Sequence, residues 1–243
     1  MVSVVIPTYH EAETIGPLLV RLSAVRRRLP EALEVLVVDD RSTDGTPDVA
    51  RRVLTAEALG RVIDRTGPRD LAQSVMEGVR HAQGDLIGVM DADLSHPPEL
   101  LPALVGAVRA GREIAIASRS VSGATVLNWP WKRRVLSRLG NLLARPLVPV
   151  ADATSGYFVC QAQLVKSLTP DARGFKILLE ILVRGGVQRV QEVPYAFTDR
   201  VHGSSKLAAR TMWRYLIQLI QLYRFRVSHP RASTLLSMQK AHA

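Results

Sequence analysis

The stretch LIGVMDADLSHPPE, residues 86–99, decides the fold, because it joins a buried strand to a polar loop and the start of a helix. Its first five residues, Leu86–Met90, are apolar and predict a strand that is buried on both faces. Asp91 and Asp93 follow directly, and Pro97-Pro98 predicts the first turn of the next helix, where proline is tolerated. A strand that runs through a loop into a helix is the unit from which parallel α/β sheets are built.

The same unit recurs along the first half of the chain. Short apolar runs rich in β-branched residues predict buried strands at Val2–Ile6, Glu34–Val38, Arg61–Asp64 and Ile114–Ser118. Between them, helical spacing of apolar residues predicts helices at Glu11–Leu29, Thr46–Leu54, Leu71–Ala82 and 97–109. This alternation indicates the α/β class, with a mostly parallel central sheet flanked by helices on both faces.

The second half is less regular. Strands are expected at Tyr157–Cys160 and Gln188–Phe197, and helices at Lys132–Leu143, Phe175–Val183 and Leu207–Arg226. The first and last of these helices mix apolar with basic residues, so we expect C-terminal amphipathic helices. We expect one domain over residues 1–228, including an amphipathic membrane-surface helix at 207–226, and a disordered tail at 229–243.

The charge of the chain favours an anionic partner. The formal net charge is +10 over 243 residues, and basic residues cluster at 132–145 and 200–231. In both clusters they alternate with Trp, Tyr and Leu, which is more typical of a membrane surface than of a nucleic-acid groove. We therefore expect a membrane partner and no nucleic acid. The alternative is a chain that is merely rich in arginine throughout.

Composition also bears on the compartment. The single cysteine, Cys160, excludes an internal disulfide framework and fits a reducing compartment. No run reaches the roughly 18 apolar residues of a transmembrane helix, and the start of the chain predicts a strand and not a signal peptide. We expect a cytoplasmic protein that is peripheral at the inner face of the cell membrane.

Chemically useful side chains follow the predicted strands. They are Pro7-Thr8-Tyr9 after the first, Asp39-Asp40 after the second, Asp91 and Asp93 after the fourth, and Ser118-Arg119 after the fifth. In open parallel sheets, ligands bind outside the carboxyl ends of the strands. These residues are therefore expected to line one site.

Asp91 and Asp93 are the predicted metal ligands. Mg²⁺ and Mn²⁺ prefer oxygen ligands and are usually bound by a few carboxylates together with substrate phosphates. A metal that bridges a diphosphate stabilises the charge that develops as a sugar–phosphate bond breaks. The alternative for two acids on a loop is a solvated turn, and the preceding apolar strand favours the metal site.

Other loops predict contacts to a nucleotide. Asp39 and Asp40 could accept hydrogen bonds from a ribose or a base, which the sheet topology favours, and the alternative is a capping turn around Ser42. Tyr9 could pack on a base and Glu11 could bond to it, or Glu11 could be a first-turn helix acid. The candidates for binding phosphates, each of which could instead be a solvated surface cation, are Arg119, Arg133, Arg134, Arg200 and Lys206.

Eight segments together resemble a known family. They are VVIPTYHE (4–11), VVDDRSTDGT (37–46), VMDADLSHPPE (89–99), ASRSVSG (117–123), NWPWKRRVLS (128–137), DATSGYF (152–158), GFKILLEIL (174–182) and EVPYAFTDRVHGSSKL (192–207). The chain is similar over residues 2–226 to glycosyltransferase family two, in particular to the dolichol- and polyprenyl-phosphate mannosyltransferases. The first and third segments are shared widely in that family, whereas the arginine-rich fifth and the last two are specific to this branch.

The resemblance implies a GT-A type fold and an inverting transfer of mannose from GDP-mannose to the phosphate of a polyprenyl or dolichyl lipid. It implies that the nucleotide sugar is held by Pro7, Tyr9, Glu11, Val38, Asp39, Asp40, Asp91, Ala92, Asp93, Lys176, Arg200 and Lys206. It implies that the acceptor phosphate is held by Arg119, Arg133, Arg134 and Ser137, and the metal, Mg²⁺ or Mn²⁺, by Asp91, Asp93 and Ser95. Asp91, Asp93, Arg119 and Arg133 are then the expected catalytic residues.

The chain departs from the family pattern at three positions. Ser95 stands where the family usually has a glutamine that can bind the metal, so we expect coordination through water or by the two aspartates alone. A glycine common after the third strand is replaced near Asp70, and His202 stands where some relatives have a second arginine.

Other functions remain open from the sequence. The donor could be UDP-glucose or UDP-GlcNAc, or the acceptor could be a sugar hydroxyl, which would need a deprotonating carboxylate that does not stand out. A basic lipid- or nucleic-acid-binding module without activity is a further alternative. The intact pair Asp91 and Asp93 argues against it.

Overall fold

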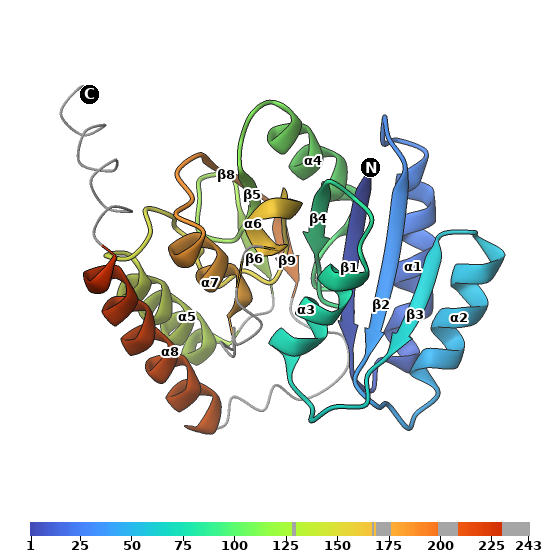
Figure 1. Cartoon of the computed structure of the whole chain (residues 1–243), viewed down its shortest axis with the longest axis horizontal. Helices are drawn as coiled ribbons and strands as arrows, with labels where there is room; N and C mark the ends of the chain where they lie inside the picture. Colours follow the sequence, from blue (N-terminus) through green and yellow to red (C-terminus); the bar gives the residue numbers. More distant parts are fainter. Residues whose placement is uncertain (128–129, 167, 169–175, 199–208, 230–243) are drawn as a thin grey trace.

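The computed structural model describes residues 1–127, 130–166, 168, 176–198 and 209–229 (Figure 1). The strands are β1 (Val2–Thr8), β2 (Leu33–Asp39), β3 (Gly60–Asp64), β4 (Leu86–Val89), β5 (Ile114–Ser118), β6 (Thr125–Leu127), β7 (Phe158–Gln161), β8 (Val190–Pro194) and β9 (Ala196–Thr198). The helices are α1 (Ala12–Arg26), α2 (Thr46–Ala56), α3 (Leu71–His81), α4 (Leu101–Arg109), which follows the 3₁₀ turn η1 (Pro98–Leu100), α5 (Trp131–Ala144), α6 (Ala162–Lys166), α7 (Ile177–Arg184) and α8 (Ala209–Ser228).

The main sheet is mostly parallel, as predicted. Among the described residues it has seven strands in the order β3-β2-β1-β4-β7-β5-β8. β1 lies near the centre, pairs in parallel with β2 and β4, and is buried along its whole length. Such a strand must be apolar on both sides, which is why its residues read as a continuous hydrophobic run.

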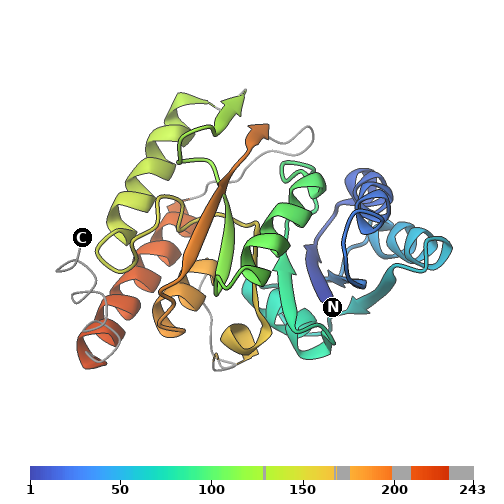
Figure 2. The ribbon, with the colours of Figure 1, turned by 90° about the horizontal axis from the view of Figure 1, so that it is seen from above.

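The two faces of the sheet carry separate hydrophobic cores. Val4 and Ile6 of β1 face one core with α1, α2 and α4, whereas Val5 faces the other with α3, α6, α7 and α8. Alternate residues of a strand point to opposite faces, so one strand contributes to both cores. Figures 1 and 2 show the sheet between these two layers of helices.

One strand of the main sheet runs against the others. β7 lies between β4 and β5 and is antiparallel to both. Val89, the last residue of β4, is paired with Phe158, the first residue of β7. The segment that enters β7 therefore lies at the carboxyl ends of β4 and β5.

The predicted single strand Gln188–Phe197 is wrong, because the segment forms two strands in different sheets. β8 pairs with β5 in the main sheet, and β9 pairs with β6 in a small parallel sheet. Between them the carbonyl of Tyr195 accepts a hydrogen bond from the backbone N–H of Thr125. Pro194 ends β8, and proline cannot donate to a ladder, so it suits the point where the chain leaves one sheet for another.

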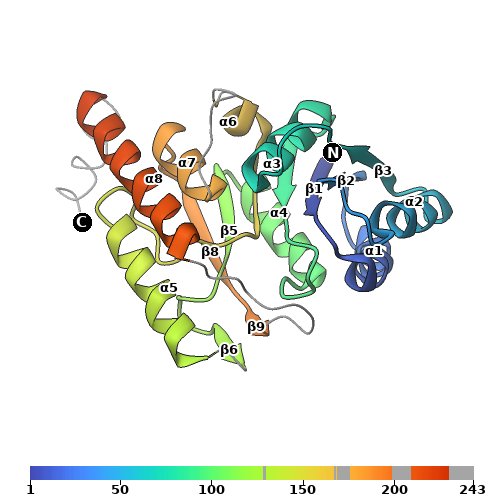
Figure 3. The same ribbon diagram turned by 90° about the horizontal axis from the view of Figure 1, so that it is seen from below.

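Helices α5 and α8 lie side by side at one end of the molecule (Figures 1 and 3). The Tyr215 hydroxyl donates to the carbonyl of Gly140, and the Tyr223 hydroxyl donates to that of Leu143, at 2.8 Å each. The expected helices at Lys132–Leu143 and Leu207–Arg226 are thus present with shifted ends. In the part of the chain that the structure describes, none of the helices combines the length and hydrophobicity that crossing a bilayer requires.

Candidate active site

The polar residues that follow β1, β2, β4 and β5 come together at one edge of the sheet, as the parallel topology requires. Asp93 is buried there, and its Oδ1 accepts hydrogen bonds from the Ser95 backbone N–H at 3.1 Å and from the Ser95 hydroxyl at 2.6 Å. The Asp91 side chain is 36% exposed. One carboxylate is thus held by the loop, while the other is open to a ligand.

His96 stabilises the loop that carries Asp91 and Asp93. Its Nδ1 accepts a hydrogen bond from the backbone N–H of Asp91 at 3.1 Å, so the ring is neutral with its proton on the other nitrogen. Burial lowers the pKa of His96, in spite of the nearby charges of Asp91 and Asp93. The neutral ring therefore fixes the backbone on which the first carboxylate is carried.

Gly156 closes one side of Asp91. A Cβ atom at this glycine would lie 2.7 Å from Oδ2 of Asp91 and 3.0 Å from Cε1 of His96. Both distances are shorter than van der Waals contact. Only glycine therefore allows the backbone to come this close to Asp91 and His96. The segment that enters β7 thus packs directly against the carboxylate.

The two aspartates suit a magnesium or manganese ion. They supply carboxylate oxygens, and among the described residues no group of three or more His, Cys, Asp or Glu side chains gathers as a complete metal cage. Mg²⁺ is commonly bound through one or two carboxylates plus substrate phosphates. Asp91 and Asp93 fit such a site, in which a donor diphosphate completes the coordination. Ser95, expected as a third ligand, uses its hydroxyl to orient Asp93.

Among the described residues that are expected to hold the nucleotide, Tyr9 is the most exposed. Its side chain is 40% exposed, with the His10 ring stacked 4.0 Å away and the Arg69 guanidinium 4.2 Å from the ring centroid. Glu11 precedes α1 and accepts a hydrogen bond from the Thr14 hydroxyl at 2.9 Å. Three further expected contacts, Pro7, Val38 and Ala92, have buried side chains, so a nucleotide there would meet their backbone.

Asp39 organises its own loop. Its carboxylate accepts hydrogen bonds from the Thr8 hydroxyl at 3.0 Å, and from the backbone N–H and hydroxyl of Ser42 at 2.8 and 2.6 Å. This is the turn around Ser42 that was the alternative explanation for this residue. A carboxylate has about four acceptor sites. The nucleotide contact therefore stays a prediction beside an observed structural role.

Asp40 joins two loops through a buried ion pair. Its Oδ1 lies 2.7 Å from Nη1 of Arg65, and its Oδ2 accepts from the backbone N–H of Asp70 at 2.8 Å. The Ser74 hydroxyl adds a third bond, at 3.3 Å. Because Arg65 directly follows β3, this pair links the loop after β2 to the loop after β3. Asp70 is the N-cap residue of α3, so its bond to Asp40 also connects the start of α3 to these two loops.

Arg119 is fixed by a buried carboxylate. Its Nε and Nη2 donate to the two oxygens of Asp152 at 2.8 and 2.9 Å, and Asp152 is fully buried. Burial alone would raise the pKa of Asp152, but the charge and hydrogen bonds of Arg119 hold it below its ordinary value. Burial likewise works to lower the pKa of Arg119, which Asp152 and, more weakly, Asp91 raise above its ordinary value.

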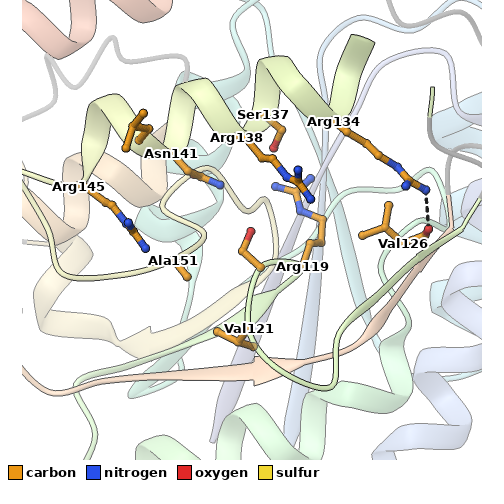
Figure 4. A pocket seen from close by; sticks show the side chains of 11 residues that line it. Arg119, Val121, Val126, Arg134, Ser137, Arg138, Asn141, Arg145 and Ala151 are labelled. Atoms are coloured by element: carbon orange, nitrogen blue, oxygen red, sulfur yellow. Dashed lines mark hydrogen bonds between the residues drawn. The ribbon is translucent and has the colours of Figure 1, made fainter. Parts of the chain in front are cut away.

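A basic cavity of about 490 Å³ lies between Arg119 and α5 (Figure 4). It is lined by Arg119, Ser120, Val121, Val126, Arg134, Ser137, Arg138, Asn141, Leu142, Arg145 and Ala151. Three residues expected to bind the acceptor phosphate are among them: Arg119, Arg134 and Ser137. The side chain of Arg133, the fourth, lies outside the described residues. Arg138 and Arg145 add two cations, which belong to the basic cluster at 132–145 but were not among the expected acceptor contacts.

Lys176 connects this region to α7. It is the residue before the first turn of α7, and its Nζ donates to the carbonyl of Thr154 at 3.1 Å. The Thr154 hydroxyl in turn lies 3.4 Å from Nη2 of Arg119. Two other expected donor-phosphate residues, Arg200 and Lys206, lie outside the described residues.

Sequence reasoning missed several residues that shape the site. Asp152 and Gly156 lie in the segment DATSGYF, in which neither residue was assigned a role, although a carboxylate and a glycine directly before a buried strand were a usable signal. Arg65 could have been found because a cation after β3 must lie beside Asp39-Asp40 after β2. His96 gave no signal, because its role depends on how the loop folds back on Asp91.

Comparisons with known proteins show the family of this chain. The model of the family "Glycosyl transferase family 2" matches residues 3–168. A dolichol-phosphate mannosyltransferase of Pyrococcus furiosus is 39% identical over 228 residues, which cover 92% of this chain but only 64% of that protein's length. The Saccharomyces cerevisiae protein of the same name is 35% identical, covering 92% of this chain and 87% of the relative. An undecaprenyl-phosphate mannosyltransferase of Micrococcus luteus is 36% identical, covering 84% and 86%.

Solved structures share the fold at lower identity. Mannosyl-3-phosphoglycerate synthase from Rubrobacter xylanophilus has a TM-score of 0.70 at 21% identity, over 95% of this chain and 75% of its own. Glucosyl-3-phosphoglycerate synthase from Mycobacterium tuberculosis, in complex with Mn²⁺ and UDP, has a TM-score of 0.67 at 20% identity, over 93% and 79%. The fold is therefore of the GT-A type, for which metal dependence is typical. On the family match and on its curated relatives, this chain is a glycosyltransferase that belongs to glycosyl transferase family 2, on the branch of the dolichol- and polyprenyl-phosphate mannosyltransferases.

Proposed function

We propose that the protein transfers mannose, with inversion, from GDP-mannose to a polyprenyl or dolichyl phosphate at the cytoplasmic surface of a membrane. The observation that carries the proposal is the basic cavity lined by Arg119, Arg134 and Ser137. The charge of Asp91 helps to raise the pKa of Arg119, which relates this cavity to the proposed metal site. A cavity rich in arginine suits a phosphate acceptor, and the names of the curated relatives point to the same lipid class.

The chemistry that follows needs no strong general base. A lipid phosphate is already ionised at neutral pH, so one of its oxygens can attack C1 of the sugar directly. The new O–C1 bond forms opposite the bond to the donor diphosphate, whose oxygen leaves with the electron pair. The products are a mannosyl phosphodiester and the nucleoside diphosphate, with the configuration at C1 inverted.

The residues of this chain contribute position and charge. Arg119, Arg134 and Ser137 hold the acceptor phosphate in the cavity, with Arg133 as a further expected contact. Asp91 and Asp93 would hold Mg²⁺ or Mn²⁺, which would stabilise the charge on the departing diphosphate. Lys176 contributes a positive charge to the donor phosphates, and the other two expected contacts, Arg200 and Lys206, lie outside the described residues. Tyr9, Glu11, Asp39 and Asp40 line the nucleotide side.

The membrane contact is proposed for the outer faces of α5 and α8. Trp213 and Ile220 of α8 are 65% and 54% exposed, and α5 exposes Trp131, Val135 and Leu139 beside its arginines. The opposite face of α8 is packed into the core through Leu219 and Leu222. Exposed apolar residues beside cations are typical of a helix that lies in the headgroup region of an anionic bilayer.

A donor screen tests the proposal most directly. Purified protein with Mg²⁺ or Mn²⁺ should transfer labelled sugar from GDP-mannose to a polyprenyl phosphate in detergent, giving a lipid-soluble product. UDP-glucose and UDP-GlcNAc are run in parallel, because UDP is the nucleotide in the M. tuberculosis structure. Transfer from a UDP-sugar alone would correct the donor, and transfer from none of the three would overturn the proposed reaction.

A further inference from the structure

We propose that Gln218 of α8 is a positioning residue for Lys176, and so for the phosphates of the donor. Gln218 is 2% exposed and faces the start of α7 from the inner side of α8. The inference rests on the proposed function, since it takes Lys176 as a contact to the donor diphosphate. It assigns a role in the donor site to a helix whose outer face is proposed to contact the membrane.

The Gln218 amide forms hydrogen bonds with both the N–H and the carbonyl of Lys176; we call this pair of bonds the clamp. Its Oε1 accepts from the Lys176 N–H at 3.0 Å, and its Nε2 donates to the Lys176 carbonyl at 3.0 Å. The same Nε2 donates to Oε1 of Glu180 at 3.1 Å, and Nε of Arg184 holds the other oxygen of Glu180 at 2.6 Å. If the amide were flipped, its NH₂ group would face the Lys176 N–H, and its oxygen would face the Lys176 carbonyl and the Glu180 carboxylate. The three contacts therefore define one orientation of the amide.

The two hydrogen bonds from Gln218 act at the N-terminus of α7. Lys176 is the N-cap residue of α7, and its side chain makes no capping hydrogen bond. Its Nζ instead reaches the carbonyl of Thr154, next to the pair of Arg119 and Asp152. The backbone of Lys176 must be fixed for its ammonium group to be aimed, and Gln218 supplies two of the bonds that fix it.

The clamp is distinct from the general docking of α8. Tyr215 bonds to Gly140 of α5, and Leu219 and Leu222 lie in the core, so α8 is seated by contacts that do not involve Lys176. Figure 3 shows α8 against α7 on one side and α5 on the other. The hydrogen bonds of a buried polar residue on such a helix orient its partner more than they hold the helix in place.

Gln218→Met tests the inference, because methionine keeps the length of the side chain and removes all three hydrogen bonds. The KM for GDP-mannose, and the Kd for GDP measured by calorimetry with Mn²⁺, should each rise about tenfold, while the KM for polyprenyl phosphate stays unchanged. Gln221→Met, at an exposed position of the same helix, is the matched control. Tyr215→Phe is the control for docking, since it loosens α8 without touching Lys176.

A double-mutant cycle separates positioning from a structural role. In a Lys176→Ala background, Gln218→Met should have no further effect on the donor KM, whereas a purely structural role would lower activity equally in both backgrounds. If Gln218→Met does not fold, Gln218→Glu takes its place, because it keeps the bond to the Lys176 N–H and loses the two donated bonds.

The outcomes distinguish this inference from the proposed function. If Lys176→Ala weakens GDP binding but Gln218→Met and Gln218→Glu leave it as in the wild type, the inference about Gln218 is wrong. The assignment of Lys176 to the donor site is then still supported. If Tyr215→Phe raises the donor KM as much as Gln218→Met does, the effect is one of docking and the inference also fails. If Lys176→Ala leaves GDP binding unchanged, the assignment of the lysine to the donor site is wrong, and this inference falls with it.

Discussion

The carboxylate of Asp152 holds the guanidinium of Arg119 by two parallel hydrogen bonds of 2.8 and 2.9 Å, in a site closed to solvent on the carboxylate side. Further donors surround the same carboxylate, from the Asn141 amide and the Thr154 hydroxyl. Glu192 of β8 in turn accepts from the backbone N–H groups of Ala151 and Asp152 at 2.7 and 3.0 Å. Arg119 therefore enters the cavity in a single orientation.

Asp152→Asn should damage both stability and acceptor binding. It leaves a buried guanidinium without its countercharge, which costs about 3–5 kcal/mol when one partner of a buried pair is removed. The KM for polyprenyl phosphate should rise more than the KM for the donor. Chemical denaturation and steady-state kinetics measure the two effects, and a variant as stable as the wild type would contradict a stabilising role for this pair.

The same substitution predicts a pH dependence. The pKa of Asp152 is lower in the folded chain than in the unfolded one, so the unfolded state binds the proton more readily. The stabilisation by Asp152 is therefore complete above the unfolded pKa of about 4 and is lost as the pH falls through the folded pKa. The stability difference between wild type and Asp152→Asn should be constant from neutral pH down to about 4 and shrink below it.

Asp93→Ala should lower kcat at least about a hundredfold, the scale of removing one electrostatic stabiliser of a transition state. The fold should survive, because Asp93 lies on a loop and its hydrogen bonds to Ser95 join residues only two positions apart. A near-wild-type rate would show that the metal site has been put in the wrong place. Circular dichroism and kinetics at several Mn²⁺ concentrations provide the check.

Gly156→Ala should inactivate the protein without unfolding it. The new methyl group would overlap Asp91 and His96, so the loop must shift and carry the carboxylate away from its position. Gly106→Ala is the matched control, since a Cβ there meets nothing within 4 Å and alanine favours the helix by up to about 1 kcal/mol. Equal activity of the two variants would rule out the close approach of Gly156 to Asp91.

Metal binding should depend on the donor. With two carboxylates and a serine that is engaged with Asp93, the protein alone should bind Mn²⁺ weakly, and GDP should tighten that binding. A chelator should abolish transfer and added Mn²⁺ or Mg²⁺ should restore it. Calorimetry with and without GDP measures the difference, and tight binding by the free protein would contradict the expectation.

Vesicle binding should depend on the outer face of α8. Trp213→Ser combined with Ile220→Ser removes exposed apolar area, and sedimentation with anionic vesicles should show affinity lower by about tenfold or more. Val20→Ser is the control, because Val20 is 54% exposed on α1, which covers the main sheet away from α5 and α8. Equal losses in both proteins, or none, would remove the support for this surface.

The main sheet could be predicted because its strands are buried on both faces and read as apolar runs. Parallel pairing brings the ends of β1, β2 and β4 together, so Tyr9, Asp40 and Asp91 could be assigned to one edge from the order of the residues alone. Boundaries moved by a few residues, as in α1, which ends at Arg26 and not at Leu29. Helix ends depend on local caps that periodicity does not contain.

The second half resisted prediction for physical reasons. A hydrophobic run such as Tyr157–Cys160 indicates a buried strand but carries no information on its direction or its neighbours. The break between β8 and β9 arises because β8 pairs with β5 and β9 pairs with β6, and the local sequence does not show which strand each will pair with. The roles of Asp152 and Gln218 arise from contacts over 33 and 42 residues of sequence, which no local spacing reveals.

The antiparallel strand β7 sets the distance between the ends of β4 and β5. Without it, β4 and β5 would be neighbours, and their ends would be separated by one interstrand spacing of about 4.8 Å. With β7 between them the separation doubles to about 10 Å, which leaves room for a hexose ring between the carboxylates that follow β4 and the arginine that follows β5. In the proposed reaction, this single reversed strand would separate the carboxylates that hold the metal from the arginine that binds the acceptor by about the width of one sugar.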